Sequence, residues 1–226
     1  FLFPEYHTRS KRFFFPRAIR YSASHANAII AISESTRRDA IKILRITPEK
    51  IFSAPLGIGP EFQPMRDAQA LADCRQKYQL PEKYLLYVGL VEPRKNLPLL
   101  LKAYRQLTMF SSPPPLVIVG RLGWGVEGIK EQIANLGIQE KVFFTGYVPA
   151  QDLPLIYSQA EIFVYPSIYE GFGFPPLEAM ACGAPTITTA ISAMGDQIGE
   201  AGLLVPPDDL DALTQAMLKI LTQAEL

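Results

Sequence analysis

Two segments of the sequence combine charged side chains with a predicted helix start, and each could bind part of a phosphorylated sugar. The first segment covers residues 89–96 (GLVEPRKN) and places Arg94 and Lys95 just before Asn96, which could cap the helix that follows. A guanidinium fork and an ammonium beside the backbone N–H groups of a helix start can hold a diphosphate. The alternative is a solvated basic pair in a loop.

The second segment covers residues 170–178 (EGFGFPPLE) and carries two carboxylates, Glu170 and Glu178. Carboxylates that face one crevice could accept hydrogen bonds from sugar or ribose hydroxyls, while Gly171 and Gly173 leave backbone amides open to a ligand. The two prolines indicate a helix start, so we expect Glu178 in the first helical turn, where the helix dipole favours it. The alternative is ordinary helix-start chemistry for Glu178 and a surface position for Glu170.

Two further motifs point to simpler interpretations. Residues 120–125 (GRLGWG) have the spacing G-x-x-G-x-G instead of G-x-G-x-x-G, and Glu140 precedes a predicted strand instead of ending one, which argues against NAD binding. The D-x-D pattern of Asp209 and Asp211 could hold a metal ion, but its place before the last predicted helix favours helix capping. We therefore expect no metal and no cofactor.

Strands that are apolar throughout alternate with helices after residue 66, which predicts an α/β fold with a parallel sheet covered by helices on both faces. Ligands of such sheets bind at the carboxyl ends of the strands, where both charged segments lie. The predicted strands are 84–88, 116–119, 142–145, 162–165, 186–189 and 203–205, and the predicted helices are 96–109, 127–136, 151–159, 175–182 and 208–222.

The first 60 residues hold too few elements for a complete domain: helices at 11–26 and 33–44, with Ser33 as the N-cap of the second, and short strands at 28–32 and 51–54. Residues 56–66 are rich in Gly and Pro and are interpreted as a linker. We predict a partial domain at residues 1–60 and a ligand-binding domain at residues 61–226. The basic and aromatic stretch 9–17 could meet a membrane surface or a lipid-linked acceptor, or could be partly buried in its own domain.

Composition excludes several classes of protein. The chain has 226 residues with 22 basic and 22 acidic side chains, so its overall charge offers no attraction to nucleic acid. Two distant cysteines form no disulfide framework and favour a cytoplasmic protein. The sequence contains no apolar run long enough to span a bilayer. The chain begins at Phe1, and we interpret it as a fragment of a longer protein.

Taken in order, these motifs resemble the GT-B glycosyltransferases of family 4, also called glycosyltransferase group 1, and in particular their mannosyltransferases. The resemblance runs over nearly the whole chain and is strongest at Glu170 and Glu178, which match the E-x7-E signature of the family. Matching segments are 3–5 (FPE), 32–39 (ISESTRRD), 55–58 (PLGI), 92–97 (EPRKNL), 146–148 (GYV), 165–167 (YPS) and 170–183 (EGFGFPPLEAMACG).

The resemblance implies a role for each matching residue. Arg94 and Lys95 would neutralise the donor diphosphate, and Glu170 would contact hydroxyls of the transferred sugar. Glu178 would hold the ribose. The remaining donor-binding residues would be Gly89, which lets the donor approach closely, Tyr147 and Val148 near the base, and Phe172, Gly173 and Phe174, whose amides lie near the sugar.

The implied function is transfer of a hexose, with retained configuration, from a nucleoside-diphosphate sugar to a glycan or lipid-linked acceptor in polysaccharide biosynthesis. GDP-mannose is the donor we favour. We expect a cytoplasmic protein that could be peripheral at the inner membrane face, and no turnover from the fragment alone. A silent nucleotide- or glycan-binding module and a GT-B epimerase or phosphorylase remain alternatives. The chain departs from many relatives at Leu90, where they carry Arg, and at Gly195 and Asp196, where they carry Pro-Glu.

Overall fold

The computed structural model describes residues 2–4, 9–121, 123 and 128–223. The chain divides into two compact units, Phe1–Gly57 and Ile58–Leu226. This division falls inside the Gly- and Pro-rich segment 56–66, whereas the sequence placed it after residue 60. Each unit has its own cluster of buried apolar side chains.

The first unit is small and pairs two short strands with two helices. Its elements are α1 (Arg9–His25), β1 (Ile29–Ala31), α2 (Glu34–Leu44) and β2 (Ile51–Ser53). The strands are parallel, and Ala31, Ile46 and Ile51 form the buried cluster. Ser33 caps α2 as predicted, because its Oγ accepts a hydrogen bond from the Thr36 amide at 3.0 Å.

Helix α1 presents aromatic and basic side chains to the solvent. Phe13, Phe14 and Phe15 are 54%, 65% and 59% exposed within the described structure, and the Arg17 guanidinium lies 3.7 Å from the centre of the Phe13 ring. Both interpretations of this stretch, an interfacial helix and a helix covered by more of its own domain, stay predictions. None of the helices that the structure describes is long and apolar enough to cross a membrane.

The second unit contains a six-stranded parallel sheet in the order β5-β4-β3-β6-β7-β8. The strands are β3 (Leu85–Val88), β4 (Leu116–Val119), β5 (Val142–Gly146), β6 (Ile162–Tyr165), β7 (Thr186–Thr189) and β8 (Leu203–Val205). Every residue of β3, β4, β6 and β7 is buried, as expected for strands covered on both faces. The predicted α/β class and parallel sheet are therefore confirmed.

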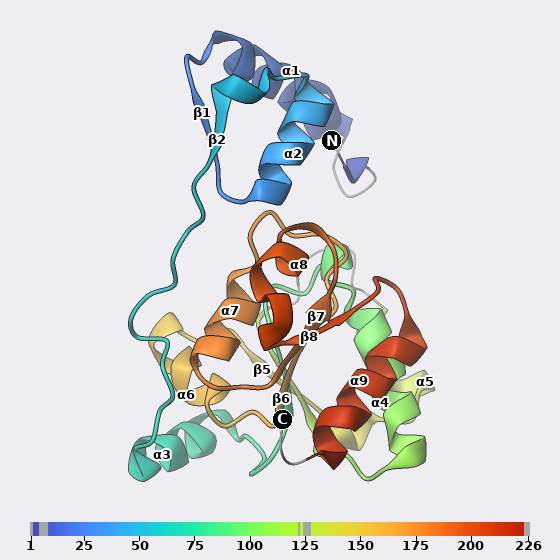
Figure 1. Ribbon diagram of the computed structural model, residues 1–226. Helices are drawn as coiled ribbons and strands as arrows, with labels where there is room; N and C mark the ends of the chain where they lie inside the picture. The colour runs from blue at the N-terminus through green and yellow to red at the C-terminus, as the bar shows by residue number, and fades with distance from the viewer. Residues whose placement is uncertain (1, 5–8, 122, 124–127, 224–226) are drawn as a thin grey trace. The chain divides into compact units, whose positions relative to one another are not determined.

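Helices cover both faces of this sheet (Figure 1). Helices α4 (Leu97–Phe110), α5 (Ile129–Asn135) and α9 (Leu210–Thr222) lie on one side, and α6 (Leu153–Tyr157) and α7 (Phe174–Ala181) lie on the other. Two helices of this unit were not predicted, namely α3 (Ala68–Tyr78) and α8 (Ser192–Ile198). A capping signal for α3 is present in the sequence, since the Asp67 carboxylate accepts from the amides of Gln69 and Ala70.

The strand order positions the candidate site. Successive strands are added to one side of β3 until β5, and then to the other side from β6 onward. At such a reversal the connections after the two central strands leave in opposite directions, which opens a crevice at their carboxyl ends. One charged segment follows β3 and the other follows β6. Topology thus brings both segments to the same crevice.

Two predicted caps have different outcomes. Asp209 caps α9 by accepting from the Ala212 amide at 2.9 Å, which confirms capping for this half of the D-x-D pattern. Asn96 does precede α4, but its side chain makes no cap hydrogen bond. Its φ of 54° lies in the left-handed region, and its Nδ2 donates to the Asp208 carboxylate at 2.6 Å. The predicted side-chain cap at Asn96 is therefore wrong, because the side chain is turned to another loop.

Candidate functional site

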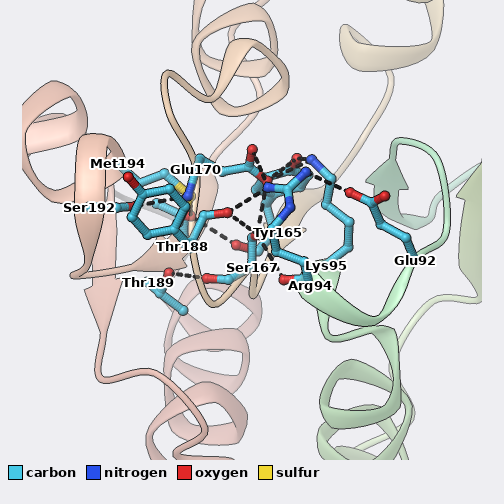
Figure 2. A network of polar contacts seen from close by, with 11 residues as sticks. Glu92, Arg94, Lys95, Tyr165, Ser167, Glu170, Thr188, Thr189, Ser192 and Met194 are labelled. Carbon is cyan, nitrogen blue, oxygen red and sulfur yellow. Dashed lines mark hydrogen bonds and ion pairs between the residues drawn. The ribbon is translucent and has the colours of Figure 1, made fainter. Parts of the chain in front are cut away.

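Arg94, Lys95 and Glu170 meet at the carboxyl ends of β3 and β6 (Figure 2). The Lys95 ammonium lies 2.6 Å from Oε1 of Glu170, and Nη1 of Arg94 lies 2.6 Å from Oε2. Glu170 is only 7% exposed, so it is neither a surface residue nor a solvated one. The alternative of a surface glutamate is therefore wrong. The alternative of a solvated basic pair is also wrong, because the side chains of Arg94 and Lys95 are only 27% and 12% exposed and both pair with Glu170.

Two hydroxyl groups complete the surroundings of the Glu170 carboxylate. The Tyr165 hydroxyl donates to Oε1 at 2.9 Å, and the Ser167 hydroxyl donates to the same oxygen at 2.8 Å. The Lys95 ammonium also donates to the Tyr165 hydroxyl. One oxygen of Glu170 thus accepts from three donors, and the other faces the guanidinium of Arg94.

Arg94 joins the two charged loops. Its Nη2 lies 2.6 Å from a carboxylate oxygen of Glu92, and its Nη1 donates to the Tyr169 carbonyl at 2.5 Å. The Arg94 carbonyl accepts from the Ile168 amide at 3.0 Å and from the Ser167 hydroxyl at 3.0 Å. These contacts hold the loop after β3 against the loop after β6, so the geometry of the cations does not depend on one ion pair alone.

The burial of these charges changes their proton affinities. Burial alone would raise the pKa of Glu170, but the positive charges of Lys95 and Arg94 outweigh it and hold the pKa below its ordinary value. Burial lowers the pKa of Lys95, against the opposing effect of the Glu170 charge. Glu170 is therefore a carboxylate at neutral pH, and it is the main counter-charge of both cations.

A second layer, supplied by β7 and α8, supports the loop that carries Glu170. The Glu170 amide donates to the Ser192 hydroxyl at 2.9 Å, and Thr189 donates to the Ser167 carbonyl at 2.6 Å. Thr188 donates to the Tyr165 carbonyl at 2.8 Å (Figure 2). No role was predicted from the sequence for Thr188, Thr189 or Ser192. The polar run TITT at 186–189, inside an otherwise apolar strand pattern, is the signal that could have found the two threonines.

A pocket of about 420 Å³ lies over the ends of β3, β4 and β5. Its lining residue Gly89 is close to Tyr165 of the charged cluster, since a Cβ there would lie 3.8 Å from the Tyr165 ring. The pocket brings together three predicted donor-binding residues, Gly89, Tyr147 and Val148. Two of the lining residues are in contact with each other: the Arg121 guanidinium lies 4.8 Å from the centre of the Tyr147 ring. The full lining is Val88, Gly89, Leu90, Val119, Gly120, Arg121, Tyr147, Val148 and Leu153.

The floor of this pocket requires glycine at residue 120. A Cβ atom on Gly120 would lie 2.1 Å from the Gly89 carbonyl oxygen, and the φ of Gly120 is +133°. The Gly89 amide in turn donates to the Val119 carbonyl at 2.9 Å. The first glycine of the G-x-x-G-x-G pattern therefore serves close packing of two strand ends. Leu122, Trp124 and Gly125 of that pattern lie outside the described residues.

The glycine-rich segment after Glu170 leads into α7. Gly173 precedes the helix with a φ of 93°, Phe172 is buried, and Phe174 begins the helix and is half-exposed. Met194 of α8 packs under this turn, since a Cβ on Gly173 would lie 3.3 Å from its Cγ. Three predicted donor-binding residues thus form one turn directly after Glu170.

Glu178 lies one turn farther along α7 than predicted. The helix begins at Phe174 and has no acidic residue in its first turn, because both prolines are already helical. The Glu178 carboxylate accepts from the buried Tyr157 hydroxyl at 2.9 Å. Burial raises the pKa of Glu178, the Tyr157 hydrogen bond opposes this, and nearby Glu61 adds to it. The structure connects Glu178 to α6 and not directly to the Glu170 cluster.

The comparisons with known proteins define first the class of fold. A glycosyltransferase from Rickettsia africae superposes with a TM-score of 0.82 at 23% identity, covering 93% of this chain and 58% of that one. Anabaena Alr3699/HepE, solved with UDP-glucose, gives 0.81 at 21% identity, covering 98% of this chain and 60% of that one. The fold is that of the GT-B glycosyltransferases, as the resemblance implied.

The sequence comparisons then define the family. Residues 73–226 match the family model "Glycosyl transferases group 1". The O-antigen chain mannosyltransferase B of Escherichia coli is 36% identical over 98% of this chain. The chain belongs to glycosyltransferase group 1. It spans 58% of the length of that mannosyltransferase.

Proposed function

We propose that the protein carrying this chain transfers a mannosyl residue from GDP-mannose to a growing glycan or a lipid-linked acceptor, with retention of configuration. The observation that carries the proposal is the convergence of Arg94, Lys95 and Glu170 beside a pocket of about 420 Å³ at the crevice of the sheet. The similarity to an O-antigen mannosyltransferase supports mannose as the sugar.

The donor would bind along the carboxyl ends of the strands. The base would lie in the pocket at Tyr147 and Val148, and the diphosphate would pass Gly89 to reach Arg94 and Lys95. The HepE structure, solved with UDP-glucose, supports a nucleotide sugar as the class of donor. Glu178 would accept hydrogen bonds from the ribose, and Glu170 with the amides of 172–174 would hold the sugar.

The proposed reaction takes place on one face of the sugar. The bond between the anomeric carbon and the diphosphate oxygen breaks, and its electron pair stays on the diphosphate. The acceptor hydroxyl attacks the anomeric carbon from the same face and gives its proton to the departing oxygen. Arg94 and Lys95 would stabilise the charge that develops on the leaving group, so the proposal needs no metal ion.

Nucleotide binding by the 226-residue chain tests the proposal directly. We expect calorimetry to show binding of GDP that is stronger than binding of UDP or ADP. Lys95→Ala should weaken GDP binding about tenfold or more, because it removes a charged donor to phosphate. Lys83→Ala is the matched control, because this lysine forms an exposed pair with Glu161, with side chains 69% and 37% exposed.

Absence of binding by all three nucleotides, or an equal affinity in Lys95→Ala, would contradict the donor site. Stronger binding of UDP or ADP would keep the site and overturn the choice of GDP-mannose. Transfer assays on the whole protein with Glu170→Ala and Lys95→Ala test the chemistry. Unchanged rates in both variants would leave a silent binding module as the better description.

A further inference from the structure

The hydroxyl group of Tyr165 lies between the two central charges of the site. It accepts a hydrogen bond from the Lys95 ammonium and donates one to Oε1 of Glu170 at 2.9 Å. Tyr165 is fully buried at the end of β6. A phenol in this place is in contact with both partners of the ion pair.

The ring of Tyr165 is held from both sides, so the position of its hydroxyl is well defined. It stacks on Tyr87 of β3 and on Phe163 of β6, with ring centres 6.0 Å apart in each case. These stacking contacts involve the ring alone. A Tyr165→Phe substitution would keep them and remove only the hydroxyl.

Binding of a diphosphate would change the partners of Glu170. In the described structure Glu170 is held by two cations and two hydroxyl groups. Phosphate oxygens would compete for the same cations, because Arg and Lys form strong hydrogen bonds with them. A carboxylate that loses its cationic partners inside a protein needs other donors to stay ionised and oriented.

Of the two hydroxyl donors to Glu170, Tyr165 has fewer competing acceptors than Ser167. Ser167 has one hydroxyl proton but three acceptors within reach, namely the Arg94 carbonyl, the Tyr169 carbonyl and Glu170, at 3.0, 3.2 and 2.8 Å. For Tyr165 the recorded acceptor, within the part of the chain that the structure describes, is Glu170. The Tyr165 hydroxyl can therefore continue to donate to Glu170 when Arg94 and Lys95 bind another anion.

We propose that Tyr165 is a positioning residue that holds the Glu170 carboxylate toward the sugar while Arg94 and Lys95 move over to the donor diphosphate. This inference rests on the proposed function. It separates two parts of donor recognition: the cations bind the diphosphate, and the carboxylate, kept in place by the phenol, binds the sugar. The loss of the Tyr165 hydroxyl should then affect the sugar part alone.

The test compares GDP-mannose with GDP in Tyr165→Phe by calorimetry on the 226-residue chain. The affinity for GDP-mannose should fall about tenfold, as expected for a lost hydrogen bond to a charged group, while the affinity for GDP stays within about twofold. The pH at which GDP-mannose binding is lost in acid should also rise, because a carboxylate with fewer donors protonates more easily.

Tyr84→Phe is the matched control. Tyr84 is equally buried, and its hydroxyl donates to the Ile156 carbonyl at 2.7 Å, away from the charged cluster. The two variants should lose similar thermal stability, but Tyr84→Phe should keep the wild-type ratio of the two affinities. If Tyr165 has a purely structural role, Tyr165→Phe should lower both affinities together and should not change the pH at which GDP-mannose binding is lost in acid. That result would overturn the inference.

The outcomes distinguish this inference from the proposed function. If the wild type binds neither ligand, the proposed function fails. If the wild type prefers GDP-mannose and Tyr165→Phe keeps that preference, only the role of Tyr165 fails. Should Tyr165→Phe not fold, Lys95→Met replaces it: this variant should bind both ligands more weakly yet keep their ratio, since the phenol still holds Glu170. If Lys95→Met loses the wild-type ratio of GDP-mannose affinity to GDP affinity, the inference is overturned.

Discussion

The ammonium of Lys95 lies 2.6 Å from the carboxylate of Glu170, although 75 positions separate the two residues in the chain. The loop after β3 carries the cation and the loop after β6 carries the anion. Both side chains are largely buried, at 12% and 9% side-chain exposure. A buried pair of this kind is costly to break, because either partner left alone keeps its desolvation penalty.

Glu170→Gln should therefore destabilise the protein. The substitution keeps the shape of the side chain but leaves Arg94 and Lys95 without their main counter-charge, so we expect the free energy of unfolding to fall by about 3 kcal/mol. Added GDP should recover part of this loss and should stabilise the variant more than the wild type. Urea denaturation with and without GDP measures both effects.

The control for this prediction is Glu161→Gln. Glu161 pairs with Lys83 at 3.2 Å on the surface, where the side chains are 37% and 69% exposed. Exposed pairs contribute little, so the change should stay within about 0.5 kcal/mol. Equal losses in the two variants would contradict the argument from burial.

Glu178→Gln should make stability less dependent on pH. Burial raises the pKa of Glu178 above its ordinary value of 4.5. In the pH window between 4.5 and this raised pKa, the native state holds a proton that the unfolded state has released. Wild-type stability therefore falls as pH rises through the window. The variant lacks this loss, and it should melt at a higher temperature than the wild type above the window and at the same temperature below it.

Melting curves from about pH 4 to about pH 8 measure this difference. The amide oxygen of the variant can still accept from Tyr157, which preserves that hydrogen bond. We expect the same variant to bind GDP more weakly, because Glu178 is the proposed ribose partner. Melting temperatures that differ by a constant amount at every pH would rule out a raised pKa as the cause.

Gly120→Ala should disturb the strand ends beneath the pocket. The added Cβ would lie 2.1 Å from the Gly89 carbonyl oxygen at a φ of +133°, so the backbone must shift. We expect a loss of about 2 kcal/mol or more and weaker nucleotide binding. Gly57→Ala is the control, since a Cβ there meets nothing within 4 Å among the described residues and should change stability by less than about 0.5 kcal/mol.

Arg94→Lys should not be a conservative change. The Arg94 guanidinium contacts three acceptors at once. Its Nη2 lies 2.6 Å from Glu92, and its Nη1 lies 2.6 Å from Glu170 and 2.5 Å from the Tyr169 carbonyl. A single ammonium cannot span these positions, so we expect a loss of about 1.5 kcal/mol and weaker GDP binding. Arg105→Lys should be neutral by denaturation, because the Arg105 guanidinium donates an exposed hydrogen bond to the Thr108 hydroxyl at 3.0 Å and lies outside the charged cluster.

Much of the fold was predictable because the central strands β3, β4 and β6 are apolar at every position. Residues of β3, β4, β6 and β7 are all buried, and a continuous apolar run between helices is the pattern of a parallel sheet covered on both faces. Helix α8 was missed for a physical reason. It begins at Ser192 with a φ of 54° and follows Ile191, which offers no side-chain cap.

The charged residues of the candidate site could be named from the sequence, but their contacts could not. Arg94, Lys95 and Glu170 stand out by charge, spacing and resemblance to the family. The roles of Tyr165, Ser167 and Ser192 do not, because hydroxyl residues in a strand or loop carry no periodic pattern. Asn96 illustrates the same limit: its type suits a helix cap, yet Asp208, 112 positions away, takes its side chain.

The sequence by itself determined the order of the strands, the family, and the two loops that carry charge, because hydrophobic pattern and residue type are local properties. The tertiary structure alone decided that Glu170 is the shared partner of Lys95 and Arg94, that Tyr165 lies between them, and that Glu178 turns to Tyr157. The pairing of Lys95 and Arg94 with Glu170 depends on distances across the reversal of strand order between β3 and β6. Residues far apart in the chain meet there, and a buried charge must find its partner in space.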